Sequence, residues 1–232
     1  MKILTYKIQD ENTHQIGVLQ DVIIYNLNTC FGNISLIELF QVDGYQERIA
    51  KHICNVDCIK HDIEEISVLS PIPKPTSLRD AYAFRQHVST SRKNRGADMI
   101  AEFDQFPVFY FSNHNAIFAD REDIALMPDH FEKLDYELEF AIVIGTGGKN
   151  ILAKDADKHI AGFCILNDLS ARRLQIEEMK LNLGPAKGKD FANVIGPYLV
   201  TPDELERKSI DTPFGKKYDL QMSCYVNGEL LS

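Results

Sequence analysis

Glu137 and Glu139 are separated by a single residue. They lie in residues 135–144, a segment whose polar and apolar side chains alternate. Strict alternation predicts a β-strand. Residues i and i+2 of a strand share one face and lie roughly 7 Å apart, so the two carboxylates should point the same way. Like charges at such positions repel each other unless a cation lies between them. The pair therefore suits a bound cation, and a solvent-facing strand edge is the alternative interpretation.

Two further acidic residues and one histidine could complete such a site. Asp168 follows the apolar run 163–166, and at the end of a buried strand an unpaired charge is costly. A turn or a helix cap is the alternative role for Asp168. If residues 78–102 are helical, Asp80 and His87 lie two turns apart on one face. An imidazole with a pKa near 6.5 could then take a proton from water at neutral pH, although a surface histidine is the simpler reading.

The overall composition favours small-molecule chemistry over binding to nucleic acids or membranes. The chain has 232 residues, 44% apolar and 25% charged, and its 34 acidic against 25 basic side chains give a net charge of −9. The basic residues form no tract, which argues against a nucleic-acid partner. The first residues carry no signal-peptide pattern, and no apolar run approaches ~18 residues, so neither secretion nor a membrane span is expected. Five cysteines, an odd number, suggest reduced thiols in a cytoplasmic protein.

A proline-rich connector, residues 71–75, divides the chain, because three prolines in five residues fit neither a helix nor a central strand. Before it, short β-branched and aromatic runs predict strands at 3–8, 16–20 and 22–26. We therefore expect a small, β-rich N-terminal domain over residues 1–70 and a larger, mainly β domain over residues 71–232. The second includes a few helices, one of them beginning near Ser170.

Three other kinds of site are not supported by the sequence. The glycine-rich turn at residues 145–150 lacks the third glycine of a dinucleotide fingerprint and the Gly-Lys-Ser/Thr of a phosphate-binding loop. No Gly-x-Ser-x-Gly elbow marks a nucleophile. A zinc site is a weak alternative because its possible ligands continue a helical run and lack finger-like separation: His52, Cys54, Cys58 and His61.

Four motifs follow one another along the chain: Asp80-x-Tyr82-x-x-Arg85-Gln86-His87, Lys133-Leu134-Asp135-Tyr136-Glu137-Leu138-Glu139, Leu166-Asn167-Asp168-Leu169-Ser170-Ala171-Arg172-x-x-Gln175, and Gly184-Pro185-x-x-Gly188-Lys189-x-Phe191. In this order and spacing they resemble the fumarylacetoacetate hydrolase family. The first motif is more similar to fumarylacetoacetase-like members than to the acylpyruvase branch. Residues 1–70 contribute little to the resemblance, beyond being compatible with the small N-terminal domain that such enzymes often have.

The resemblance implies an α+β, mainly β fold, in which a mixed β-roll catalytic domain follows the N-terminal domain. It implies a homodimer that binds Mg²⁺ or Ca²⁺, with Mn²⁺ as a further possibility, and a small dicarboxylic keto acid as substrate. The carboxylates around the ion would be those of Asp80, Glu137, Glu139 and Asp168. The remaining site residues would be His87 as general base, Lys189 beside the ion or the developing negative charge, and Tyr82, Arg95, Tyr110 and Gln175 against the substrate.

The activity implied by the resemblance is hydrolysis of a carbon–carbon bond in a fumarylacetoacetate-like β-diketone. A divalent ion would polarise the chelated carbonyl and stabilise the departing enolate, while His87 would activate the attacking water. Lys189 would add positive charge where the oxyanion forms. An isomerase or decarboxylase of 2-oxo or β-keto acids would need the ion but no attacking water. A non-catalytic cation-binding module is a third reading.

The sequence departs from the family pattern at three places. Met179 stands where fumarylacetoacetase has a substrate-binding tyrosine, and Asn193 stands where it has a threonine near the ion. The hairpin signal Asn227-Gly228 is followed by only four residues, too few for a full returning strand. We therefore expect that a C-terminal segment, with the glutamate that orients the catalytic histidine, is missing from this sequence.

Overall fold

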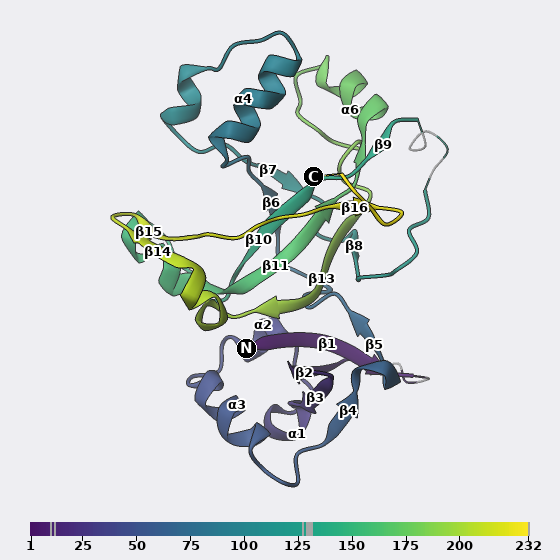
Figure 1. Cartoon of the computed structure of the whole chain (residues 1–232), viewed down its shortest axis with the longest axis vertical. Helices are drawn as coiled ribbons and strands as arrows, with labels where there is room; N and C mark the ends of the chain where they lie inside the picture. The colour runs from purple at the N-terminus through teal and green to yellow at the C-terminus, as the bar shows by residue number, and fades with distance from the viewer. Residues whose placement is uncertain (10, 12, 127, 129–131, 232) are drawn as a thin grey trace.

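The computed structural model of the chain describes residues 1–9, 11, 13–126, 128 and 132–231. It is a mixed α+β fold dominated by sheet, which confirms the expected fold class (Figure 1). One nine-stranded sheet runs through the molecule, and short helices and small two-stranded sheets surround it. None of the helices in the described residues is long and apolar enough to cross a membrane.

The strands of the main sheet come from both parts of the chain. Their order is β10 (Leu138–Ile144), β11 (Ile160–Asp168), β13 (Asn193–Val200), β1 (Lys2–Ile8), β2 (Gln15–Gln20), β3 (Ile23–Asn26) and β4 (Lys60–Asp62). Two more lie off this path: β5 (Ile66–Leu69) pairs with β1, and β8 (Ile117–Phe118) pairs with β13. All of these pairings are antiparallel except that of β8 with β13.

The N-terminal part follows the sequence-based expectation closely. The strands predicted at 3–8, 16–20 and 22–26 are β1, β2 and β3. They are followed by α1 (Asn28–Phe31), α2 (Leu36–Leu39), α3 (Tyr45–Ile53) and the 3₁₀ helix η1 (Ile63–Glu65). Ser35 and Glu38 form a capping box that begins α2. Gly44, at φ 64°, turns the chain into α3 in the left-handed region that glycine tolerates best.

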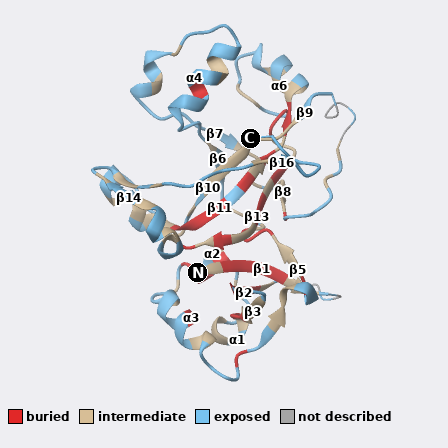
Figure 2. Ribbon diagram, in the orientation of Figure 1, coloured by how far each residue is buried: buried red, intermediate tan, exposed pale blue. Residues whose placement is uncertain are grey.

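Strand β1 connects the two parts of the molecule. At its start Ile3 pairs with Leu199 of β13, and further along Thr5 pairs with Leu69 of β5. Buried residues gather where these strands meet (Figure 2). One core cluster draws on both sides of residue 70: Ile3, Ile16, Val18, Leu27, Leu36, Leu39, Phe40, Ile49, Ile72, Ala161, Cys164, Leu166, Ile195 and Leu199. Sheet and core thus continue across the expected boundary, and the division into two domains stays a prediction.

The segment expected to be helical from 78 to 102 is different in the structure. Leu78–Asp80 forms strand β6, paired with β7 (Tyr110–Ser112), and only Arg85–Asn94 forms α4. A second short helix, η2 (Ala101–Asp104), is 3₁₀. The expectation that Asp80 and His87 share one helix face is therefore wrong, because pairing with β7 holds the chain extended at Asp80.

The remaining elements lie around β10, β11 and β13 in Figure 1. They are β9 (Leu134–Asp135), η3 (Ala153–His159), β12 (Ser170–Ala171), α6 (Arg172–Met179), η4 (Pro202–Lys208), β14 (Ser209–Thr212), β15 (Gly215–Tyr218), β16 (Tyr225–Val226) and β17 (Glu229–Leu230). The expected turn at Asn227-Gly228 is present between β16 and β17, with φ of 51° and 84°.

Candidate metal centre

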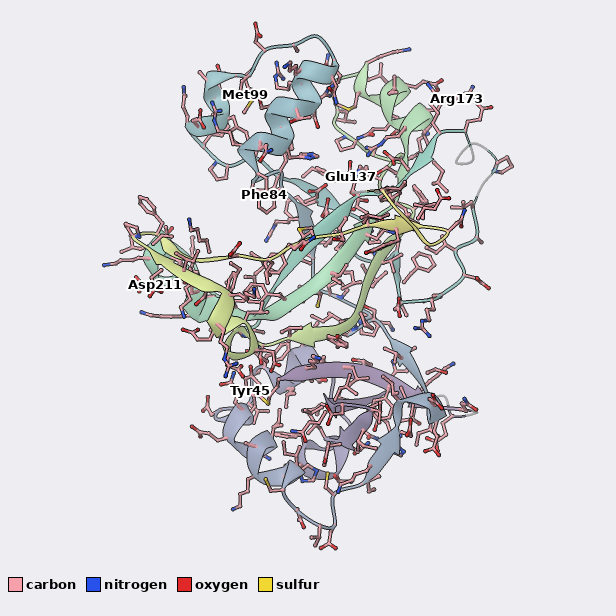
Figure 3. The ribbon with its side chains drawn as sticks, in the orientation of Figure 1. Tyr45, Phe84, Met99, Glu137, Arg173 and Asp211 are labelled. Atoms are coloured by element: carbon pink, nitrogen blue, oxygen red, sulfur yellow. The ribbon has the colours of Figure 1, made fainter. Side chains whose placement is uncertain are left out.

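Four carboxylates converge at the upper end of the main sheet, where Figure 3 labels Glu137. Glu139 lies in β10, Glu137 directly precedes that strand, and Asp168 ends the neighbouring β11. The backbone N–H of Asp168 donates to the carbonyl of Glu137 at 3.0 Å, which fixes their relative position. Asp80 reaches the same point from the end of β6. One ligand oxygen from each of the four lies within 4.8 Å of the others.

Lys189 places a positive charge among these carboxylates. Its Nζ lies 2.5 Å from Oε2 of Glu137 and 2.6 Å from Oδ2 of Asp168, and its side chain is only 4% exposed. The second oxygen of Asp168, Oδ1, is buried and has no hydrogen-bond partner in the part of the chain described. A buried carboxylate oxygen without a partner is costly, so this oxygen is a natural ligand for a further cation.

The electrostatics of the cluster show that one lysine does not neutralise it. Burial, reinforced by Asp80, Asp168 and Glu137, raises the pKa of Glu139 to about 8. Burial also raises the pKa of Asp168 to about 6, against the opposing effect of Lys189. The pKa of Glu137 is lowered, because Lys189 and Arg172 together outweigh its burial. Ionising Glu139 is thus opposed by burial and by the negative charge of its neighbours, and a bound cation would relieve that opposition.

Arg172 is a site residue to which the sequence assigned no role. At the start of α6, its Nη2 donates to Oε1 of Glu137 and its Nε to Oδ2 of Asp135, both at 2.7 Å. Its Nη1 donates to Oε1 of Gln175 at 3.0 Å, so Gln175 lies beside the cluster through Arg172. The signal was present in the third motif, because Arg-x-x-Gln spacing puts both side chains on one helix face.

Of the residues expected to touch substrate, Tyr110 lies within the cluster. Its hydroxyl donates to Oδ2 of Asp168 at 3.2 Å, and burial together with the charge of Asp168 raises its pKa, so it remains a neutral donor. Tyr82 is 50% exposed and stacks on Phe103. Arg95 is exposed and donates from Nε to the carbonyl of Ser91. The described contacts do not bring Tyr82 or Arg95 to the carboxylates.

His87 lies in the first turn of α4 and is exposed. Together with Phe84, Arg85, Gln86 and Thr90 it lines a shallow depression on that helix. No described hydrogen bond or ion pair joins His87 to the carboxylate cluster. Its role as general base therefore stays a prediction.

The possible zinc ligands in the N-terminal part do not assemble. Nε2 of His52 lies 3.3 Å from Sγ of Cys58 but also 2.9 Å from the carbonyl oxygen of Asn26. Cys54 is exposed, and burial raises the pKa of Cys58, which disfavours the thiolate that zinc requires. Within the residues described, the only group of three or more close metal-ligating side chains is the carboxylate cluster.

The donor set fits a hard divalent cation. Carboxylate oxygens are the ligands that Mg²⁺, Ca²⁺ and Mn²⁺ prefer, and the cluster contains no sulfur or imidazole ligand among the described groups. The unpartnered Oδ1 of Asp168 and the raised pKa of Glu139 identify the two carboxylates least satisfied by the protein itself. A divalent ion would satisfy both.

Comparison with known proteins places this site in a family. A family model described as "Fumarylacetoacetate (FAA) hydrolase C-terminal" matches residues 76–232, which include all four carboxylates and Lys189. The chain belongs to the fumarylacetoacetate hydrolase family. The expected resemblance is thereby confirmed, and the family is enzymatic, with hydrolases, isomerases and tautomerases among the proteins that the chain resembles.

Three curated relatives illustrate the range of this family. "Fumarylacetoacetate hydrolase domain-containing protein 2 homolog" of Dictyostelium discoideum is 25% identical over the whole chain and 74% of its own length. "Oxaloacetate tautomerase FAHD2B, mitochondrial" of Bos taurus is 36% identical over 72% of the chain and 48% of its own length. "Fumarylacetoacetase" of Oryza sativa subsp. japonica is 44% identical over 35% of the chain and 20% of its own length. The chain thus spans about half of the length of the Bos taurus relative and a fifth of the length of the Oryza sativa relative.

Solved structures share the fold. A putative HpcE protein from Mycobacterium smegmatis superposes with a TM-score of 0.69 and 20% identity, over 99% of this chain and 74% of that one. Maleylpyruvate hydrolase from Sphingobium sp. SYK-6, in complex with manganese(II) and pyruvate, superposes with a TM-score of 0.63 and 16% identity. The superposition covers 88% of this chain and 68% of that one. At these identities the likeness establishes the fold of the family for this chain.

Proposed function

We propose that the protein catalyses cation-dependent enolisation of a small 2-oxo or β-keto dicarboxylic acid, as an isomerase or tautomerase does. The observation that carries this proposal is the position of Lys189 Nζ, between Glu137 and Asp168 and beside the least satisfied carboxylates. Positive charge held there stabilises an oxyanion as it forms. The relative named oxaloacetate tautomerase is consistent with this class of substrate.

The residues of the chain divide this work between them. Asp80, Glu137, Glu139 and Asp168 would hold the divalent ion. When bound, that ion would act as a Lewis acid toward the chelating oxygens of a 2-oxo acid. Lys189 would face the enolate oxygen, and the neutral Tyr110 hydroxyl would hold Asp168 in place by the hydrogen bond that it donates and would offer its oxygen as an acceptor to substrate. Arg172 would hold Glu137 and Gln175 in place.

Hydrolysis of a carbon–carbon bond is the second candidate. It is favoured by the stretch that is 44% identical to a fumarylacetoacetase and by a fold shared with a maleylpyruvate hydrolase. It needs a base that activates water, and His87, the residue we assign to that task, is exposed on α4. The two candidates share the enolate and differ in whether water attacks.

Turnover assays separate the candidates. The purified chain, with Mn²⁺ or Mg²⁺ or with a chelator, would be given oxaloacetate enriched in its enol form, and the decay of the enol absorbance followed. A parallel assay would offer an acylpyruvate and fumarylacetoacetate and detect acid products by chromatography. Cation-dependent loss of enol without acid product is the expected result. Acid formation from the diketones would favour hydrolysis, and CO₂ release would favour a decarboxylase.

We further propose Mg²⁺ or Ca²⁺ as the resident ion, with Mn²⁺ as an alternative, a homodimeric assembly and a cytoplasmic location. The four-carboxylate donor set supports any of these ions. Light scattering would test the assembly. Cell fractionation would test the location, and it is informative because a relative is named as mitochondrial.

A further inference from the structure

The lysine that enters the carboxylate cluster lies on an irregular segment. Residues 180–192, between α6 and β13, contain turns but no helix or strand. Within this segment the N–H of Lys189 donates to the carbonyl of Ala186 at 2.9 Å, which closes a tight turn. A turn of this kind does not by itself determine where a long lysine side chain ends. Other contacts must fix it.

Glu178, in the last turn of α6, provides two of these contacts. Its Oε1 accepts a hydrogen bond from the backbone N–H of Lys187 at 3.1 Å, and its Oε2 accepts one from the N–H of Gly188 at 3.0 Å. The Glu178 side chain is 15% exposed. Bonds from backbone amides to an ionised carboxylate are stronger than bonds between neutral groups. Both oxygens of Glu178 therefore hold the two residues that precede Lys189.

Gly188 lies directly against the same helix. A Cβ on Gly188 would come within 2.8 Å of the backbone of Gln175, so only glycine fits at this approach. Its carbonyl oxygen accepts from the N–H of Ala171 at 2.9 Å, just before α6 begins. The turn thus contacts α6 at several points. Among these contacts, those of the Glu178 side chain can be removed by substitution without steric conflict.

We propose that Glu178 is a positioning residue whose carboxylate, by holding the amides of Lys187 and Gly188, places Lys189 Nζ between Glu137 and Asp168. The proposal rests on the proposed function only for its kinetic consequence. The placement itself concerns groups that this chain supplies and can be measured without cation or substrate.

The two oxygens of Glu178 allow a graded test. Glu178→Ala removes both acceptors. Glu178→Gln keeps one, because an amide has a single carbonyl oxygen, and its NH₂ group cannot accept from a backbone N–H. Glu177→Ala is the matched control, because Glu177 is the preceding residue of α6, is exposed and pairs with Arg173 at the surface.

The first measurement is chemical labelling of lysines with a water-soluble acetylating ester, in the presence of chelator, read by peptide mass spectrometry. Exposed Lys180 is the internal reference, and buried Lys189 should be protected in the unaltered protein. We expect Glu178→Ala to raise labelling of Lys189 relative to Lys180 about tenfold or more, since local opening governs access to a buried group. Glu178→Gln should lie in between, and Glu177→Ala should match the unaltered protein.

The second measurement is a double-mutant cycle on turnover, with Glu178→Ala and Lys189→Met alone and combined. If Glu178 acts through Lys189, the Glu178→Ala substitution should lower kcat when Lys189 is present. It should have no further effect on kcat in the Lys189→Met background. Additive losses would show a merely structural role.

Protection of Lys189 that persists in a folded Glu178→Ala or Glu178→Gln variant would overturn the proposal. If the alanine variant does not fold, the glutamine variant decides the labelling result. An unaltered protein that neither binds Mn²⁺ nor turns over a 2-oxo acid would contradict the proposed function, and the labelling result would still stand on its own.

Discussion

Nζ of Lys189 lies 2.6 Å from Oδ2 of Asp168, and the two side chains are only 4% and 2% exposed. A buried ion pair of this kind is costly to break from one side, because the remaining charge loses its partner without regaining water. In this protein the pair also borders Glu139, a carboxylate whose pKa is raised by burial and by its acidic neighbours. The same lysine therefore bears on both stability and chemistry.

Replacing Lys189 with methionine should destabilise the cation-free protein. Loss of one partner of a buried pair costs about 3–5 kcal/mol, which urea unfolding in chelator would measure. Saturating Mn²⁺ should recover part of this loss, because the ion supplies charge to the same oxygens. Lys180→Met, at an exposed position, is the control. Equal unfolding midpoints for Lys189→Met and the unaltered protein would contradict the assignment.

Replacing Glu139 with glutamine should separate cation binding from folding. The change removes one ligand charge, so we expect Mn²⁺ affinity, measured by electron paramagnetic resonance of the free ion, to fall at least about tenfold. In chelator the same variant should be as stable as the unaltered protein or more so, because one of several repelling carboxylates is gone. Glu132→Gln is the exposed control. Unchanged affinity in Glu139→Gln would remove Glu139 from the site.

The stability of the cation-free protein should depend on pH through Glu139. Its folded-state pKa is about 8, above the ordinary value of 4.5, so the folded state binds the proton more tightly than the unfolded state. This contribution therefore favours folding at low pH and is lost as the pH rises from about 4.5 to about 8. Saturating Mn²⁺ should reverse the trend, because the ion competes with the proton. Urea unfolding across this range, compared with Glu139→Gln, isolates the contribution.

The sequence predicted the composition of the candidate site better than the path of the chain to it. The sequence predicted that Glu137 and Glu139 point the same way and that Asp168 ends a buried strand, and both carboxylates do meet Asp168, although Glu137 precedes β10 and does not lie in it. Asp80 was expected on a helix and lies at the end of β6, because that strand pairs with β7, about thirty residues further along. Local patterns carry no information about such long-range pairing.

The contacts of Arg172 also could not be predicted from local sequence patterns. Its motif was visible, but its partners Asp135 and Glu137 precede it by more than thirty residues, and the pairing of β9 with β12 brings them together.

The division at residue 70 is a related case. A proline-rich connector suggests a boundary, yet β1 pairs with β13 and the core continues across it.

Replacing His87 with alanine should distinguish the two reactions. A base that activates water is needed for hydrolysis, and removing it typically costs about 10²–10⁴-fold in rate. Enol–keto interconversion moves a proton at carbon but needs no attacking water, and the exposed His87 has no described contact with the carboxylates, so cation-dependent loss of the oxaloacetate enol should change less than about threefold. His14→Ala, at an exposed position in the N-terminal part, is the control. If diketone hydrolysis is present and survives His87→Ala, His87 is not its base.

The pairing of Ile3 with Leu199 also bears on how the chain acquires its structure. Lys2 and Ile3, at the start of β1, must wait for partners almost two hundred positions later, whereas β5 covers the rest of that edge. Contacts between such distant residues slow folding, and an uncovered strand edge invites association with other chains in the meantime. The short loops that join β1, β2 and β3 provide partners on the other edge at once. Late closure of the sheet at the start of β1 is therefore a property that this strand order builds into the fold.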